Sequence, residues 1–317
     1  MKTSILGSSL VVLVGGFACD PSANIALFEA EQGTSGASVA GPQSSERVSV
    51  CDRHASSAGA TAIPAGAEVW RWAFSHDDAL QLTSVASDPT TDAVFVARAA
   101  GETFKVDRSG SVVWEKPFGS LVAADGRGNA YVAGTFSGEV VLGARTLTSA
   151  GGTDVYVALL DANGGISFAR VLGAEADETA VGIAVDGRGN AVVSGPGLGT
   201  VKLDTMGRTL WQKEFFGHVA VDSTGNVLLT GALTGTMSFG AVTLESEGGE
   251  DVFVAKLDSA GNTVFARGFG DAGVAQYGEA IAVDRGDDIL VSGVIDGSVD
   301  FGGGPLEVPP GTCPSES

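Results

Sequence analysis

The sequence predicts an all-β protein in which short strands and tight turns repeat along most of the 317 residues. Three observations carry this prediction: 47 glycines accompany many valines, only 18% of residues are charged, and one turn motif recurs at regular spacing. Glycine-rich turns between β-branched runs are typical of antiparallel sheets. Disorder would need more charge and fewer large apolar residues, and the glycines lack the three-residue period of collagen.

The N-terminus has the features of an export signal, residues 1–18. Lys2 precedes an apolar run from Ile5 to Val14, and Ala18 and Cys19 follow. A ten-residue run is too short to cross a bilayer as a helix but suits a cleavable signal. The segment resembles a bacterial lipoprotein signal, which implies lipid on Cys19, although Gly16 stands where such signals usually carry leucine. The alternative is ordinary cleavage near Ala18 that leaves Cys19 unmodified.

The next segment, residues 19–66, is rich in serine, alanine and glycine and has little hydrophobic pattern. Such a composition buries too little apolar area to offset the entropy of ordering. We therefore expect a flexible tether at 19–66, a folded body at 67–308 and a short tail at 309–317.

Two turn motifs alternate along the folded body. The first has the form Ala-x-Asp followed by Gly-Asn or a relative, with aspartates at 88, 125, 186, 222 and 284 and asparagines at Asn129, Asn190 and Asn226. The second, as in Lys202-Leu-Asp-Thr-Met-Gly207, has aspartates at 107, 161, 204 and 258. Within each motif, positions two copies apart differ by 97 or 98 residues, which indicates an internal repeat.

Each copy predicts a hairpin turn. The aspartate accepts a hydrogen bond from the N–H two residues on, and Gly or Asn takes the positive-φ position. The strands that follow are apolar on both faces, so each sheet must be covered on both sides. Small sheets stacked face to face in a ring meet that requirement.

The predicted fold is therefore a β-propeller of about five four-stranded blades, at roughly 69–107, 112–161, 166–204, 210–258 and 264–308. The longer units carry an inserted hairpin. The fifth unit stops at Gly302-Gly-Gly-Pro-Leu-Glu307, where another strand is expected. Either the ring closes with an N-terminal strand near Val48 to Val50, or it is incomplete.

Two copies, "GNAYVAGTFSGEVVLG…LTSAGGTDVYVALLDANG" and "GNVLLTGALTGTMSFG…LESEGGEDVFVAKLDSAGN", resemble the SBBP repeats of exported bacterial proteins, over about residues 69–306. "KVDRSGSVVW" and "KLDTMGRTLW" are similar to the repeats of quinoprotein-like (PQQ-type) propellers. The SBBP resemblance implies a seven-bladed ring, of which this chain supplies about five blades. It implies a binding or surface protein more than an enzyme.

Candidate site residues all have a structural interpretation. Asp125, Asp186, Asp222 and Asp284, with the three asparagines, are expected to be turn residues, and a cation-binding ring of these aspartates is the alternative. The aromatic residues at matching positions are expected to pack between blades: Trp70, Trp114, Phe168, Trp211 and Phe265. The alternative for the tryptophans, Trp72 included, is a carbohydrate platform.

No catalytic, metal or cofactor site is predicted. His54, His76 and His218 lie far apart in the sequence, and no nucleophile or phosphate-loop motif is present. The prediction is a non-catalytic binding or scaffold protein of the cell envelope. The alternatives are a lyase or hydrolase propeller, or an assembly scaffold resembling the lipoprotein propeller of the outer-membrane barrel-insertion machine.

The net charge and the cysteines predict the kind of partner and a disulfide bond. A net charge of −20 disfavours nucleic acid and anionic lipid surfaces, so a protein or glycan partner and contact with the membrane through lipid alone are expected. In an oxidising compartment, on the periplasmic face or cell surface, Cys51 and Cys313 are expected to pair. The alternative is two free or intermolecular thiols.

Overall fold

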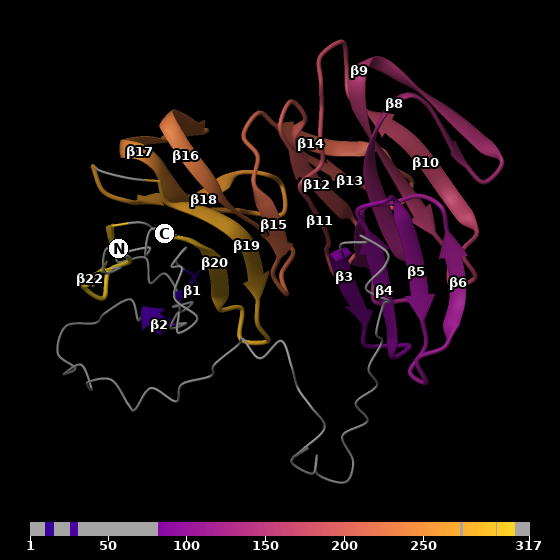
Figure 1. Cartoon of the computed structure of the whole chain (residues 1–317), viewed down its shortest axis with the longest axis horizontal. Coiled ribbons are helices and arrows are strands. Elements are labelled where there is room, and N and C mark those ends of the chain that lie inside the picture. Colours follow the sequence, from indigo (N-terminus) through magenta and orange to yellow (C-terminus); the bar gives the residue numbers. More distant parts are fainter. Residues whose placement is uncertain (1–9, 16–25, 31–81, 273–274, 296, 308–317) are drawn as a thin grey trace, which may run out of the picture.

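A computed structural model describes residues 10–15, 26–30, 82–272, 275–295 and 297–307 of the protein. Four consecutive stretches of chain each form one antiparallel four-stranded sheet in chain order (Figure 1). The first sheet contains β3 (Leu82–Asp88), β4 (Ala93–Arg98), β5 (Glu102–Val106) and β6 (Val112–Lys116). The second contains β7 (Leu121–Ala124), β8 (Ala130–Leu142), β9 (Arg145–Leu160) and β10 (Ile166–Leu172).

The third and fourth sheets repeat this plan. The third contains β11 (Gly182–Val185), β12 (Ala191–Gly195), β13 (Gly199–Leu203) and β14 (Thr209–Lys213). The fourth contains β15 (His218–Val221), β16 (Val227–Phe239), β17 (Val242–Leu257) and β18 (Thr263–Phe269). All pairings within these four sheets are antiparallel.

The fifth sheet departs from the plan. Its own strands are β19 (Tyr277–Val283) and β20 (Ile289–Val294), which pair antiparallel. On the free side of β20 lies β1 (Leu10–Gly15), paired in parallel, and β2 (Ala26–Ala30) pairs with β1. The chain then forms a separate hairpin of β21 (Ser298–Asp300) and β22 (Pro305–Glu307).

The sheets stand side by side, with their first strands β3, β7, β11, β15 and β19 in succession along the inner edge. Figure 1 shows the row open between the first and fifth sheets. The all-β prediction is confirmed: radially packed four-stranded sheets form a β-propeller arrangement whose ring is not closed.

The hydrophobic core is divided among the interfaces between successive sheets. Phe95, Ala97 and Trp114 of the first sheet pack on Val132 and Leu160 of the second, and similar clusters fill the next three interfaces. Both central strands of the third sheet, β12 and β13, are buried at every position. This agrees with the expectation that strands apolar on both faces are covered on both sides.

The boundaries of the units differ from the expected ones by one strand. The aromatic strand at 112–116, expected to open a second unit, is β6 and pairs with β5 of the first sheet. The same holds for β10, β14 and β18, each of which closes its sheet. A repeat period fixes the length of a unit but not its starting point, and only strand pairing shows which strands share a sheet.

The inserted hairpins are continuous with the sheets. In the second sheet β8 and β9 run on past a register shift at Ser137/Glu139, so that Glu139–Leu142 pairs with Arg145–Thr148. The fourth sheet does the same with β16 and β17. The longer units therefore keep four strands and lengthen the middle two.

Candidate functional site

The turn aspartates hold the first hairpin of each sheet. In the second sheet Asp125 Oδ1 accepts from the backbone N–H groups of Arg127 and Asn129, at 2.8 and 3.1 Å, and Asn129 Nδ2 donates to Oδ2 at 2.8 Å. Asp186 with Asn190 and Asp222 with Asn226 repeat this geometry. In the fifth sheet Asp284 accepts from the N–H groups of Gly286 and Asp288. Local backbone geometry thus accounts for these aspartates.

Two lysines, one buried and one partly buried, neutralise two of them. Lys202 Nζ lies 2.9 Å from Asp186 Oδ2, with the two side chains 1% and 3% exposed, and Lys256 Nζ lies 2.9 Å from Asp222 Oδ2. Burial alone would raise the pKa of each aspartate, but hydrogen bonds from asparagine and lysine outweigh it and hold the pKa below its usual value. Because lysine occupies the anionic face of both turns, the alternative of a cation-binding ring of these aspartates is not supported.

Lysine or tyrosine side chains bond each of the first three sheets to the next one along the chain. Lys105 Nζ of the first sheet donates to the carbonyl of Gly128 in the second at 2.9 Å, and Lys202 Nζ of the third donates to Gly225 of the fourth at 3.3 Å. In the second sheet Leu159 replaces lysine, and its cross-strand neighbour Tyr131 donates from its hydroxyl to Gly189 at 2.7 Å. Burial, followed by nearby carboxylates, raises the pKa of Tyr131 to about 12, so the hydroxyl stays a donor. Sequence reasoning missed this role, although lysine recurs in the second turn motif.

The aromatic residues of the outer strands cover a glycine of the neighbouring sheet. A Cβ on Gly164, Gly207 or Gly261 would lie 3.0 Å or less from the ring of Trp114, Phe168 or Trp211, respectively. The Nε1 groups of Trp114 and Trp211 also donate to the carbonyls of Ala162 and Ser259, at 3.2 and 3.1 Å. The structure thus places these aromatics between sheets, where packing was expected, and Phe265 lies against the cluster between the fourth and fifth sheets.

Several other sequence-predicted residues lie outside the described residues: Cys19, Cys51, Cys313, Trp70, Trp72, His54 and His76. His218 is described, at the start of β15. Burial lowers its pKa, and Glu279 opposes this shift in part.

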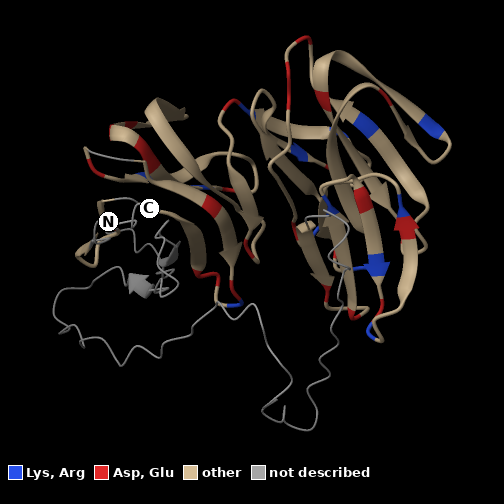
Figure 2. Cartoon of the chain, in the orientation of Figure 1, with Lys and Arg blue, Asp and Glu red and all other residues tan. Residues whose placement is uncertain are grey.

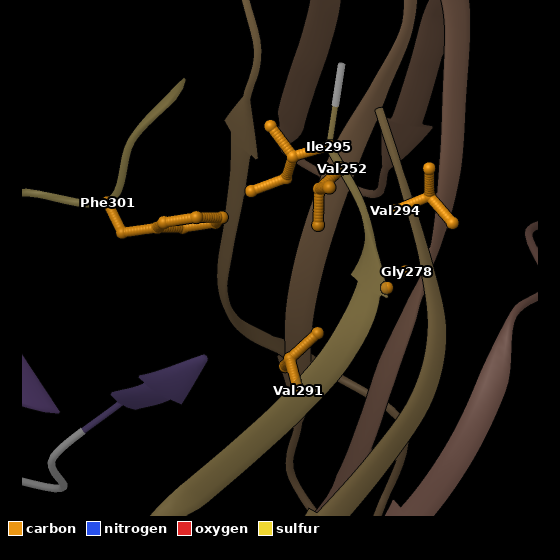
Figure 3. A pocket seen from close by; sticks show the side chains of 7 residues that line it. Val252, Gly278, Val291, Val294, Ile295 and Phe301 are labelled. Carbon is orange, nitrogen blue, oxygen red and sulfur yellow. The ribbon is translucent and has the colours of Figure 1, made fainter. Parts of the chain in front are cut away.

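Two cavities lie between sheets. The smaller, about 10 Å³, is apolar and lies between the fourth and fifth sheets, where Phe301, Ile295 and Val252 turn toward one another (Figure 3). It has room for about one water molecule and is too small for an organic ligand. The larger, about 260 Å³, is lined by strands β10, β13 and β14 and by the loop that contains Glu178.

In the larger cavity Arg170 bonds the second sheet to the third, whereas Gln212 bonds within the third sheet. Arg170 Nη1 donates to the carbonyl of Gly207 at 2.7 Å and to Thr209 Oγ1 at 3.1 Å, and Gln212 Nε2 donates to Leu198 O at 3.0 Å. The cavity also reaches Gly173, Ala174 and Glu178. Glu178 is 4% exposed.

The acidic residues are spread over loops and strand ends rather than collected in one site. Figure 2 shows Asp and Glu residues at the turn between β19 and β20 and at hairpin ends of several sheets. Across the described ranges, no three His, Cys, Asp or Glu side chains come close enough together to hold a metal on their own. The same part of the chain contains no helix of the length and hydropathy that a membrane crossing needs.

Comparisons with known proteins find solved structures of limited similarity and assign no family. It is similar to a crystal structure of a protein of unknown function from Bacteroides caccae (11% identity, 71% of this chain and 90% of the other, TM-score 0.37). It is also similar to the Cps50 (Swd1) β-propeller domain of Myceliophteria thermophila (10%, 72% and 73%, 0.48) and to the Pan2 WD40 domain of Neurospora crassa (13%, 68% and 61%, 0.41). No protein-family model and no curated protein sequence matches the chain.

Proposed function

We propose that the protein is an exported, lipid-anchored propeller of the bacterial cell envelope that binds a protein or glycan and performs no catalysis. The non-catalytic part is supported by the structural roles of the repeated polar residues. Lys105, Tyr131 and Lys202 each bond one sheet to the turn of the next, and the turn aspartates close hairpins or pair with lysine. These residues therefore join neighbouring sheets and close their turns.

The anchoring part is supported by the N-terminal sequence, in which the apolar run Ile5 to Val14 leads to Ala18-Cys19 and then to a polar segment. Cleavage before Cys19 removes β1 and so exposes the free edge of β20 in the mature protein. A diacylated cysteine with an additional N-acyl group provides the more than one chain that stable anchoring needs.

Anchoring is tested on the protein expressed in a bacterial host with its own N-terminus. The expected mature N-terminus is Cys19 carrying a diacylglycerol group, and the protein is expected to enter the detergent phase after phase partitioning. Cys19→Ser is the matched control and is expected to lose both properties. An unmodified Cys19 in the wild-type protein, or a mature N-terminus elsewhere, overturns the anchor.

Binding without catalysis is tested with the mature protein as bait in solubilised membranes and with glycan arrays. We expect saturable binding of one envelope protein or glycan, competed by the soluble Cys19→Ser protein. The same preparation is incubated with polysaccharide and ester substrates and is expected to release no more product than a buffer blank. Turnover above that blank contradicts the proposal and favours the lyase or hydrolase alternative.

A further inference from the structure

Two carboxylates with no basic partner face each other inside the second sheet. Asp154 of β9 is 0% exposed and Glu178, in the loop after β10, is 4% exposed. A Cβ on Gly173 would collide with both Asp154 Oδ1 and Glu178 Oε2, so the missing side chain of Gly173 leaves one small space that both oxygens border. Backbone pairing of Glu178 N–H with Thr153 O, at 2.7 Å, fixes the loop in this position.

The hydrogen bonds to this pair leave one oxygen without a donor. Asp154 Oδ2 accepts from the N–H groups of Ala150 and Gly151, at 2.6 and 3.4 Å, and Glu178 Oε2 accepts from Ala174 N–H at 3.2 Å. Asp154 Oδ1 has no hydrogen-bond partner. A buried carboxylate oxygen without a donor is costly, and a second carboxylate beside it adds repulsion.

Among the described residues, no cationic side chain compensates this charge. Neither carboxylate belongs to any of the ion pairs of the described residues. Arg170 lines the same cavity, but its Nη1 donates to Gly207 O and Thr209 Oγ1 of the third sheet. The cavity of about 260 Å³ reaches Gly173 and Glu178 and gives a hydrated ion a path to the pair.

We propose that Asp154 and Glu178 bind a calcium ion at the interface of the second and third sheets. The side-chain donors are oxygens, which suit Ca²⁺ and not the softer metals that histidine and cysteine select. Ca²⁺ takes six to eight oxygen ligands, and backbone carbonyls and water supply those that the two carboxylates do not. Mg²⁺ fits less well because it demands a near-ideal octahedron at short distances.

The fourth sheet provides a natural comparison. Asp251 and Gly270 occupy the places of Asp154 and Gly173, and the backbone bond from Gln276 N–H to Glu250 O matches the one made by Glu178. Gln276 thus stands where the second sheet has Glu178, which removes one of the two charges. The doubly acidic arrangement belongs to the second sheet alone among the described long units, so we expect one ion per chain.

The test measures the melting temperature of the whole protein in EDTA and in excess CaCl₂, with the dissociation constant determined by calorimetry. We expect a Kd of about 10⁻⁴–10⁻³ M, as in weak extracellular calcium modules, and a rise in melting temperature of several degrees at saturation. MgCl₂ at equal concentration is expected to give a smaller shift.

Variants locate the ion. Asp154→Asn and Glu178→Gln preserve shape and are each expected to weaken calcium binding at least tenfold, whereas Asp251→Asn in the fourth sheet is expected to leave the Kd unchanged. Because the calcium shift is measured within each variant, a change in basal stability does not obscure it, and either variant alone decides if the other fails to fold.

Three outcomes overturn the proposal. Absence of both binding heat and a calcium-dependent melting shift in the wild-type protein does so, and so does a shift that survives in both variants. The third is a proton shared by the two carboxyls instead of a metal. In that case the stability of the wild-type protein falls as pH rises above the ordinary carboxyl range, with or without calcium. Glu178→Gln does not show this fall.

Discussion

Lys202 carries its charge in a place that is 1% exposed, between the carboxylate of Asp186 and the carbonyl of Gly225 in the next sheet. Lys202→Met keeps the aliphatic packing but leaves Asp186 as a buried carboxylate without its counter-ion. Removal of one partner of a buried pair costs about 3–5 kcal/mol, and we expect the free energy of unfolding to fall by that amount. Urea denaturation measures it. Arg188→Met, on an exposed side chain, is the control and should change stability by less than about 0.5 kcal/mol. A loss for Lys202→Met no larger than the control's contradicts the assigned role.

A single residue, His218, makes the stability of the protein depend on pH. Burial lowers its pKa in the folded protein, so the unfolded chain binds the proton more readily. Stability is therefore unaffected by this residue above the unfolded pKa of about 6.5 and falls as pH drops below it. We expect the wild-type protein to lose more unfolding free energy between pH 7.5 and 5.5 than His218→Asn. Equal losses in urea titrations at the two pH values would show that His218 is not buried as a neutral group.

At the scale of single strands, Trp114 of β6 joins the first two sheets by covering Gly164 and donating to Ala162 O. It is 8% exposed, so Trp114→Ala creates a cavity at the interface and should cost about 3–5 kcal/mol. Trp211→Ala should cost less because its side chain is more exposed, and Met206→Ala, at a side chain 70% exposed, is the control. Thermal denaturation followed by circular dichroism ranks the three. Near-wild-type melting of Trp114→Ala would contradict its packing between sheets.

Strands and turns were predictable from the sequence because their signals are local. Asp125 and Asn129 lie four residues apart and close their own hairpin, and alternation of apolar residues marks the strands. Partners on different strands carry no fixed spacing: Lys202 follows Asp186 by 16 residues in the third sheet, while Lys256 follows Asp222 by 34 in the fourth, because the fourth sheet lengthens its middle strands. The buried position of Asp154 could not be predicted from the sequence for the same reason. The available signal was that Asp154 in "GGTDVYV" recurs as Asp251 in "GGEDVFV". Its neighbour Glu178, however, lies in a different part of the chain, the loop after β10.

At the scale of the whole molecule, the open row of sheets leaves the two ends with unequal strand numbers. The first sheet has four strands of its own, whereas the fifth has β19 and β20 and is completed by β1 and β2 from the N-terminal region. If Cys19 is the mature N-terminus, β1 is lost and the edge of β20 becomes available for another strand. The proposed cleavage before Cys19 would therefore change how the fifth sheet is completed.

A disulfide between the two cysteines that remain after Cys19 would join the two ends of the propeller. Cys51 and Cys313 both lie outside the described residues, but their distance from described strands limits where they can reach. Cys313 follows the end of β22 at Glu307 by six residues, a span of at most about 20 Å. Cys51 precedes Leu82 of β3 by 31 residues, a span of up to about 100 Å when extended. In an oxidising compartment we therefore expect a disulfide between them.

Such a bond closes a loop of more than 250 residues, for which the chain-entropy model gives a stabilisation of about 4–5 kcal/mol. Non-reducing peptide mapping should recover one cross-linked peptide pair, and Cys313→Ser should lower the melting temperature to that of the reduced wild-type protein. If both thiols alkylate without a reductant, the two ends of the propeller are not covalently joined.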